Sequence, residues 1–328
     1  MFPAHFKNQE QGSRQIANAA SLEVFGDEVQ EISIGPQDKT IRINKLLPEQ
    51  FKEALKIIFL EFKDVFSWDH TELKGIDLRV CQHKIPLRLD ARPIKMQRYR
   101  MNPNYAAKVK EEIDALLKAG FIAEVESSDW LFPVVVVPKK NDNLRIFVDF
   151  RMLNEQKIKD PFSLPFTDTM LDEVAGHEMY SFLDGYSGYN QISLAEEDRE
   201  KTTFITEWGA FIYLVMPFGL CNAPTTFQRA MMTIFSKYLQ KFMAVFVDDF
   251  TVYSSMAKHL ECLGFMFQKC RDKRVCLNPY KCLFGAFKGV LLSHVVSRDG
   301  IEMKQDKIKA IQEAVAPTNT GKISSFLG

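Results

Sequence analysis

The sequence has 328 residues, of which 46% are hydrophobic and 26% charged, so it is long enough for two or more packed subdomains of a globular protein. Its 42 basic and 42 acidic side chains give a formal net charge of zero, which predicts neither nucleic-acid nor membrane binding from overall charge. An apolar signal segment and a stretch of bilayer-spanning length are both absent, and the six cysteines lack zinc-finger spacing. We therefore expect an intracellular protein with reduced thiols and no membrane partner.

The first half of the chain predicts helices and one hairpin after a polar start. Residues 1–45 are expected to be a linker or tail with one short strand near 29–35. Apolar residues at helical spacing predict helices over 47–66 and 102–120. Asn102 fits the cap of the second helix, Pro103 its first turn and Gly120 its end. The apolar runs 132–138 and 144–150 flank the polar stretch "KKNDN" and predict a hairpin.

The second half alternates strands and helices without a regular repeat. Strands are expected at the start of 178–192, as a pair within 201–220 joined near Glu207 and Gly209, as a hairpin over 244–253, and within 275–285 and 289–300. Helices are expected over 222–240, with Asn222 as the cap, over 256–274 and over 304–316. Hairpins and helices without regular βαβ units favour an α+β fold over a doubly wound sheet.

One segment is strongly basic although the chain as a whole is neutral. Between positions 84 and 110 only Asp90 opposes the basic side chains, and Tyr99 and Tyr105 lie among them. The basic residues are Lys84, Arg88, Arg92, Lys95, Arg98, Arg100, Lys108 and Lys110. Two interpretations stay open: a solvated face, or a surface that follows phosphates while the tyrosines stack on bases.

Two adjacent acids, Asp248 and Asp249, lie in the middle of the apolar run "AVFVDDFTVY". Burying two neighbouring carboxylates is costly, so this pattern needs a reason. They could form a simple hairpin turn, although Asp-Asp is a poor turn sequence. Alternatively they bind a divalent metal such as Mg²⁺, which prefers carboxylate oxygens and relieves the repulsion between close acids. In the second case we expect them at an exposed hairpin tip.

A third acid in a similar context is Asp184, in "SFLDGYSGY". It follows an apolar strand and precedes a glycine break. If the two strands lie side by side, three carboxylates converge as in two-metal phosphoryl transfer. Asp149 is better explained by an internal ion pair with Arg151. The remaining candidates are expected to be solvated; they are Asp172, Glu173, Glu196, Glu197 and Asp198.

Several motifs in order carry a family resemblance. They are "LRIFVDFRMLN", "FLDGYSGYNQI", "KTTFITEWGAFIYLVMPFGLCNAPTTFQRAM", "FVDD", "LNPYKCLFG" and "SHVVSRDGI". Over roughly residues 45–328 the chain resembles the reverse transcriptases of Ty3/gypsy-type long-terminal-repeat retrotransposons, and among them those of plants. This resemblance implies a right-hand polymerase fold with fingers, a ferredoxin-like antiparallel palm sheet with helices, and a partial thumb.

The resemblance also implies a division of the chain. The approach segment and fingers would cover 46–160, and the palm 161–300 with a fingers insertion near 194–212. The start of the thumb or connection would cover 301–328, cut off before ribonuclease H. Asp-Thr-Gly or Asp-Ser-Gly protease triplets are absent from the sequence. By the same analogy the protein would work in a cytoplasmic particle or the nucleus; its oligomeric state is not implied.

Roles for individual residues follow from the resemblance. Asp184, Asp248 and Asp249 would bind two Mg²⁺ ions, with Mn²⁺ as a substitute, for primer extension on an RNA or DNA template. The residues implied to bind the incoming dNTP are Lys139 or Lys140, Arg145, Tyr189, Phe218, Gly219 and Gln228. The hairpin implied to grip the primer end comprises Leu292, Ser293, His294 and Val295.

Two residues depart from the family pattern. Asn143 replaces a frequent glycine in the fingers turn, and asparagine tolerates positive φ. Ser293 replaces a usual glycine in the primer hairpin, where a side chain would intrude. Three functions fit the sequence: RNA-directed DNA polymerase, a catalytically inactive nucleic-acid-binding remnant, and a two-metal nuclease. The nuclease leaves Arg145 unexplained, because hydrolysis needs no triphosphate site.

Overall fold

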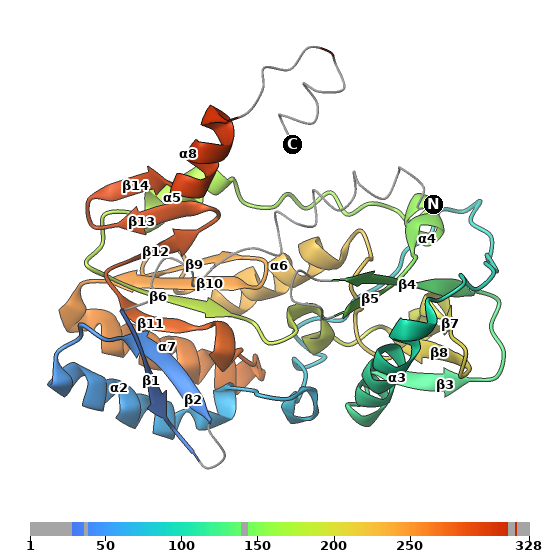
Figure 1. Cartoon of the computed structure of the whole chain (residues 1–328), viewed down its shortest axis with the longest axis horizontal. Helices are drawn as coiled ribbons and strands as arrows, with labels where there is room; N and C mark the ends of the chain where they lie inside the picture. The colour runs from blue at the N-terminus through green and yellow to red at the C-terminus, as the bar shows by residue number, and fades with distance from the viewer. Residues whose placement is uncertain (1–27, 36–38, 139–143, 314–318, 320–328) are drawn as a thin grey trace.

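A computed structural model of the chain describes residues 28–35, 39–138, 144–313 and 319 (Figure 1). Within these residues a six-stranded sheet lies at one end of the molecule and a five-stranded sheet at the other, with a small three-stranded sheet above the first (Figure 1). No helix in this part of the chain is both long and apolar enough to cross a bilayer. Helices combined with mainly antiparallel sheets confirm the expected α+β class.

The six-stranded sheet has the order β1-β2-β11-β6-β10-β9. Its strands are β1 (Val29–Ser33), β2 (Thr40–Asn44), β11 (Leu283–Ala286), β6 (Met179–Asp184), β10 (Asp249–Ser254) and β9 (Met243–Phe246). All neighbours are antiparallel except β2 and β11. The short strand expected near 29–35 is confirmed as β1, whereas the expectation of a polar linker is wrong for β2, because its Ile41 and Ile43 are completely buried.

Both faces of this sheet are covered, which explains why β6 is an unbroken buried run. Met179 and Leu183 belong to the main core, whereas Tyr180 and Phe182 belong to a second, smaller core. This split follows the period of two that every strand has. The main core contains a group of aromatic rings in contact, Phe59, Phe66, Phe267 and Phe284.

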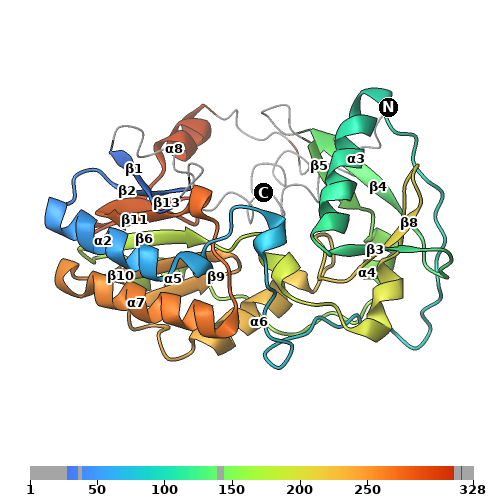
Figure 2. The same ribbon diagram turned by 90° about the horizontal axis from the view of Figure 1, so that it is seen from below.

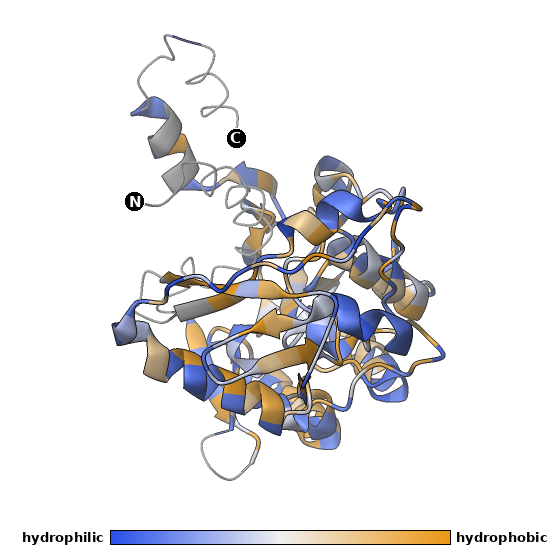
Figure 3. Ribbon diagram, turned by 90° about the vertical axis from the view of Figure 1, so that its right-hand side faces the viewer, coloured by the Kyte–Doolittle hydropathy of each residue, from blue (hydrophilic) through white to orange (hydrophobic). Residues whose placement is uncertain are grey.

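Two long helices pack on the main-core face of the six-stranded sheet (Figure 2). They are α2 (Glu49–Glu61) and α7 (Met256–Lys273). Helix α6 (Ala223–Phe235) contacts α7 and β9, and α5 (Thr167–Val174) lies against β9 and supplies the second core. In the hydropathy view the helices carry hydrophobic and hydrophilic residues side by side along their length (Figure 3).

The five-stranded sheet has the order β3-β8-β7-β4-β5. Its strands are β3 (Ile122–Val125), β8 (Ala210–Tyr213), β7 (Phe204–Ile205), β4 (Phe132–Pro138) and β5 (Leu144–Val148). Helix α3 (Pro103–Lys118) packs on it. The predicted cap is confirmed, since the Asn102 side chain accepts from the Asn104 N–H at 3.0 Å. Gly120 ends the helix with φ +70°. The short helix α4 (Arg151–Gln156) follows β5.

The three-stranded sheet is an antiparallel meander on the second-core side. Its strands are β12 (Lys288–Leu291), β13 (His294–Ser297) and β14 (Gly300–Met303), followed by α8 (Gln305–Gln312). It packs on the six-stranded sheet through Gly289. A Cβ added at Gly289 would lie 1.9 Å from Cε2 of Phe182, so only glycine permits this close approach. Short 3-10 helices complete the fold: η2 (Lys63–Val65), η3 (His70–Glu72), η4 (Gly188–Gln191), η5 (Glu196–Thr202) and η6 (Pro279–Lys281).

Candidate active site

The three acids of the sequence analysis meet at one end of two neighbouring strands. Asp184 is the last residue of β6 and Asp249 the first of β10, and the two are directly opposite in the antiparallel register. Opposite residues point to the same face of a sheet, with Cβ atoms typically about 4.5–5.5 Å apart. Asp248 precedes β10 in the turn from β9. The strands therefore lie side by side as the sequence predicted.

The expectation that these acids avoid burial is wrong. Asp184 is 6% exposed and Asp249 is 7% exposed, while Asp248 is half-buried. Burial raises the pKa of Asp184 to about 6, and the nearby charge of Asp248 adds to this effect. Burial, together with the charges of Asp248 and Asp184, raises the pKa of Asp249 well above its usual range. The protein thus holds carboxylates in a place that disfavours their charged form unless a cation compensates.

Lys281 in η6 supplies one such cation, which was not among the residues predicted for the site. Its Nζ donates to Oδ1 and Oδ2 of Asp184 at 3.2 and 3.1 Å, and this ion pair lowers the pKa of Asp184 against the effect of burial. The stretch "LNPYK" indicates a capped turn with Asn278 as the cap, but not the contact itself, because Lys281 reaches Asp184 only when β11, which begins two residues later, pairs with β6. Within the described ranges, no three His, Cys, Asp or Glu side chains are arranged as ligands of an ion.

The β9–β10 hairpin has a two-residue turn, Val247-Asp248, because Phe246 pairs with Asp249. Two contacts hold the turn against the loop that follows β6. The N–H of Gly185 donates to the carbonyl of Asp248 at 2.8 Å. A Cβ at Gly188 would lie 3.1 Å from the Cβ of Asp248, so the glycine permits close packing of the acid. The glycines after Asp184 therefore fix where Asp248 lies.

Gln228 lies in α6 and is completely buried. Its Oε1 accepts from the Val247 N–H at 2.5 Å, and its Nε2 donates to the Val245 carbonyl at 2.9 Å. Both ends of the amide are therefore bonded to the backbone of the β9–β10 hairpin. The side chain supports the hairpin that carries the acids, a role that differs from the nucleotide contact implied by the resemblance.

An aromatic group lies beside this turn. The ring of Tyr189 packs 4.8 Å from that of Phe218 and 5.9 Å from that of Phe227, measured between centroids. Tyr189 is buried and Phe218 is exposed. Gly219 has φ +97°. The side-chain amide of Asn154 donates to its carbonyl at 2.8 Å, and this hydrogen bond holds the loop that carries Phe218. The structure thus brings together Tyr189, Phe218 and Gly219, three residues predicted to bind nucleotide.

Residues 137–314 match the family model described as reverse transcriptase (RNA-dependent DNA polymerase). The chain belongs to the reverse transcriptase family. The retrovirus-related Pol polyproteins of the Drosophila melanogaster transposons 297 and gypsy are 32% and 31% identical to it, over 89% and 86% of the chain. These relatives confirm the Ty3/gypsy-type resemblance. The chain spans 27% and 28% of their length.

Solved reverse transcriptase structures share the fold. Two foamy viral protease-reverse transcriptases, one in complex with an RNA/DNA hybrid and one with double-stranded DNA, superpose with TM-scores of 0.75 and 0.77 at 18% identity. Each superposition covers 86% of this chain, and 38% and 49% of the respective foamy viral chain. The predicted polymerase fold is confirmed by this likeness.

In this reverse transcriptase family member, the residues predicted to grip the primer form the β12–β13 turn. Leu291 pairs with His294, which leaves Leu292 and Ser293 as the turn residues. Both have positive φ, 48° and 66°. This is the conformation of a type I′ hairpin turn, where Asn-Gly is favoured. Ser293 therefore occupies a position whose positive φ glycine would adopt without strain. Val295 follows in β13.

The predicted triphosphate contacts of the family cannot be placed in the same way. Lys139, Lys140 and Asn143 lie outside the described residues. Arg145 is in β5, but nothing is described of its side chain. The predicted internal ion pair nearby is confirmed: Arg151 contacts Asp149 at 2.6 Å.

The basic segment between Lys84 and Lys110 is partly neutralised by local acids. The pairs are Lys84–Glu197, Arg88–Asp90, Lys95–Asp129 and Lys110–Asp114, at 2.5–3.8 Å. Basic side chains that pair with nearby acids in this way favour the interpretation of a solvated face. Tyr99 is exposed, and its hydroxyl donates to Asp149 at 2.9 Å. Nucleic-acid binding by the rest of the segment stays a prediction.

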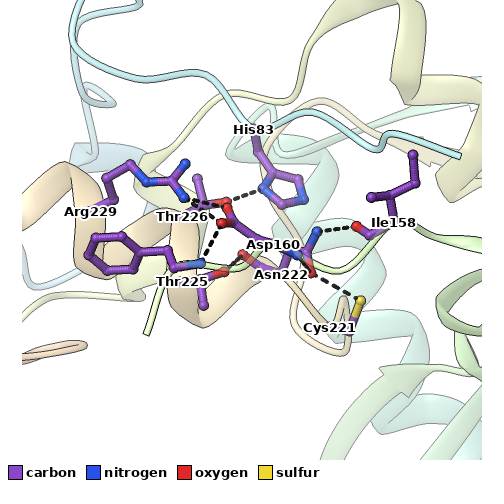
Figure 4. A network of polar contacts seen from close by, with 9 residues as sticks. His83, Ile158, Asp160, Cys221, Asn222, Thr225, Thr226 and Arg229 are labelled. Atoms are coloured by element: carbon purple, nitrogen blue, oxygen red, sulfur yellow. Dashed lines mark hydrogen bonds and ion pairs between the residues drawn. The ribbon is translucent and has the colours of Figure 1, made fainter. Parts of the chain in front are cut away.

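A polar cluster anchors the start of α6 in this fold (Figure 4). Arg229 forms two short contacts to Asp160, at 2.5 and 2.6 Å. Asn222 accepts from the Asp160 N–H at 3.2 Å and donates to the Ile158 carbonyl at 2.9 Å. Asn222 is the cap residue of α6 as predicted, but its side chain makes no capping bond because it binds this neighbouring segment instead.

The same cluster contains two buried titratable groups. Nδ1 of His83 lies 2.9 Å from Oγ1 of Thr226, and its Nε2 lies 3.1 Å from Nζ of Lys157. Burial lowers the pKa of His83 to about 3 and that of Lys157 to about 8. The expectation of a solvated Asp198 is also wrong: it is buried and accepts from the Ile85 N–H at 2.7 Å beside His83.

Proposed function

We propose that this chain is an RNA-directed DNA polymerase domain that extends a primer with dNTPs on an RNA or DNA template. The observation that carries the proposal is the meeting of Asp184, Asp248 and Asp249 at the ends of two paired strands, in a chain of the reverse transcriptase family. The product is one new phosphodiester bond and pyrophosphate. The relatives are much longer than this chain, so the activity of the chain alone belongs to the proposal.

The donor set suits the divalent metals proposed for the reaction. Carboxylate oxygens are the ligands that Mg²⁺ prefers, and Mn²⁺ accepts them too. The raised pKa values of Asp184 and Asp249 indicate a site that needs positive charge, and Lys281 provides one. Two Mg²⁺ ions, when bound, would activate the primer 3′-hydroxyl and stabilise the charge of the leaving pyrophosphate. Asp184, Asp248 and Asp249 would hold them.

The neighbouring residues would position the substrates. Tyr189 packs against Phe218 next to Gly188, so a sugar bound beside Asp248 would meet an aromatic surface with little space for a 2′-hydroxyl. Arg145, with Lys139 or Lys140, would contact the triphosphate, since planar guanidinium and ammonium groups suit phosphate oxygens. The β12–β13 turn from Leu292 would hold the primer end.

Primer extension on an RNA template with Mg²⁺ tests the proposal directly. The purified chain is expected to extend the primer, and Asp248→Asn is expected to reduce the rate at least about a hundredfold, because a carboxylate ligand is lost. Asp272→Asn makes the same chemical change at an exposed position of α7 that is not one of the three acids, and it is expected to extend normally. Equal rates for Asp248→Asn and wild type would refute the assignment.

Extension measured alongside binding separates the polymerase from the inactive alternative, because binding alone does not. Both predict salt-sensitive binding of a primer–template. Binding without extension, by wild type and Asp248→Asn alike, would favour the nucleic-acid-binding remnant. Cleavage of the template without extension would favour the nuclease.

A further inference from the structure

The turn that carries Asp248 contains a backbone conformation that its residue type disfavours. Val247 has φ +53°, in the left-handed region. For a β-branched residue this is a true outlier, because the branched Cβ crowds the backbone. Asp248 is absent from the positive-φ residues, so only the first turn position is left-handed, as in a type II′ turn, where glycine is usual. The strain therefore lies one residue before the acid pair.

Two anchors hold Val247 in this conformation. Its side chain is completely buried in the main core, together with Phe227 and Phe250. Its N–H donates to Oε1 of Gln228 at 2.5 Å, and Nε2 of the same amide donates to the Val245 carbonyl at 2.9 Å. The amide thus spans the residue before Phe246 and the residue after it. A turn that relaxed to negative φ would redirect the Val247 N–H away from this acceptor.

We propose that Gln228 is a positioning residue that keeps Val247 left-handed and thereby fixes Asp248 and Asp249 opposite Asp184. This inference rests on the proposed function, because it concerns the same acids. It assigns Gln228 no contact with substrate, since the side chain is completely buried and both ends of its amide bind the hairpin. Strained backbone of this kind persists only where surrounding contacts determine it.

The test compares Gln228→Met in two backgrounds that differ only in backbone freedom. Val247→Ala and Val247→Gly both remove the buried side chain, but only glycine accepts φ +53° without strain. In the wild-type and Val247→Ala backgrounds, Gln228→Met is expected to lower kcat of primer extension about a hundredfold, with KM for dNTP changed less than about threefold. In the Val247→Gly background the loss is expected to be under about tenfold, because glycine keeps the turn without help.

The same fold-loss in the Val247→Ala and Val247→Gly backgrounds overturns the proposal, as does a rise in KM with kcat unchanged. Gln268→Met on α7 is the matched control, since Gln268 is exposed and its side-chain amide donates to Asp272 at 2.8 Å. If Gln228→Met does not fold, the melting temperatures of Val247→Gly and Val247→Ala test whether the turn is strained. Val247→Gly is expected to melt at a higher temperature than Val247→Ala, against the usual order of the two residues, and the usual order overturns the proposal.

A measurement that does not depend on catalysis distinguishes a failure of this inference from a failure of the proposed function. Amide hydrogen exchange at Val247, followed by NMR, is expected to accelerate at least about tenfold in Gln228→Met and to stay unchanged in Gln268→Met, because the Gln228 bond protects this amide. Unchanged exchange in Gln228→Met overturns the positioning role of Gln228, whether or not the chain extends primers. Accelerated exchange in a chain without polymerase activity would support the positioning role of Gln228. It would refute only the proposed function.

Discussion

Individual side chains decide how the acids behave, and the sequence revealed them only in part. Asp184, Asp248 and Asp249 were recognisable because carboxylates in apolar strands need a reason. Lys281 was not, because its distance of 97 residues from Asp184 is closed only when β11 pairs with β6. Local patterns contain no information about such a contact. The same limit applies to Gln228, whose partners lie in a different element.

Replacing Lys281 is expected to change the protonation of Asp184. The ammonium group favours the charged carboxylate, so Lys281→Met should raise the pKa of Asp184 above its value of about 6. The metal-free chain would be titrated by NMR, following the carboxyl carbon of Asp184. Lys288→Met, on the exposed side of β12, is the matched control. A midpoint unchanged by Lys281→Met would show that the ion pair has no effect on this acid.

At the level of elements, the predictions succeeded where a pattern is local. The helices now seen as α3, α6 and α7 and the hairpins β4–β5 and β9–β10 were all expected from periodicity and turn residues. Strand β2 was missed, although Ile41 and Ile43 alternate with polar residues, because five residues between polar segments are a weak signal. Its parallel pairing with β11 joins residues about 240 positions apart and cannot be read locally.

Two glycines of different elements allow a matched stability test. Gly289→Ala in β12 should destabilise the protein by about 1–3 kcal/mol, because the new Cβ would overlap Phe182 of β6 and push the three-stranded sheet away. Gly264→Ala in the middle of α7 meets nothing within 4 Å and should stabilise by about 0.5–1 kcal/mol. Urea unfolding measures both. Equal stability of wild type and Gly289→Ala would contradict the close packing.

Across the whole molecule, buried polar groups connect segments that lie far apart in the chain. Nε2 of His259 lies 2.8 Å from Oγ of Ser181, and its Nδ1 lies 2.8 Å from Oγ of Ser254. The Ser254 hydroxyl donates to the Ser255 carbonyl at 3.1 Å, so it accepts from Nδ1 of the neutral imidazole. Nε2 then accepts from the Ser181 hydroxyl, which also accepts from the Gly285 N–H. This series of hydrogen bonds connects β6, β10, β11 and α7. The polar cluster that contains His83 connects neighbouring segments to α6 in the same way.

These buried histidines predict that acid destabilises the fold. Burial lowers the pKa of His259 to about 3, as it does for His83, whereas an unfolded histidine titrates near 6.5. Below pH 6.5 the unfolded chain therefore binds more protons, and each histidine should lower the free energy of unfolding by about 1.4 kcal/mol per pH unit down to pH 3. Asp184 opposes this trend, since its raised pKa favours the folded state as pH falls from 7 to 4.

A single substitution isolates the histidine contribution from that opposing effect. The unfolding free energy of wild type and His259→Gln would be measured by urea titration from pH 8 to pH 4. Between pH 8 and pH 7 the two curves should run nearly parallel, because an unfolded histidine with a pKa near 6.5 is only about one quarter protonated at pH 7. From pH 6 to pH 4 the wild-type curve should fall more steeply, by about 1.4 kcal/mol per pH unit. Parallel curves over the whole range would mean that His259 binds its proton equally in the folded and unfolded chain, and the neutral Ser181–His259–Ser254 chain would then be wrong.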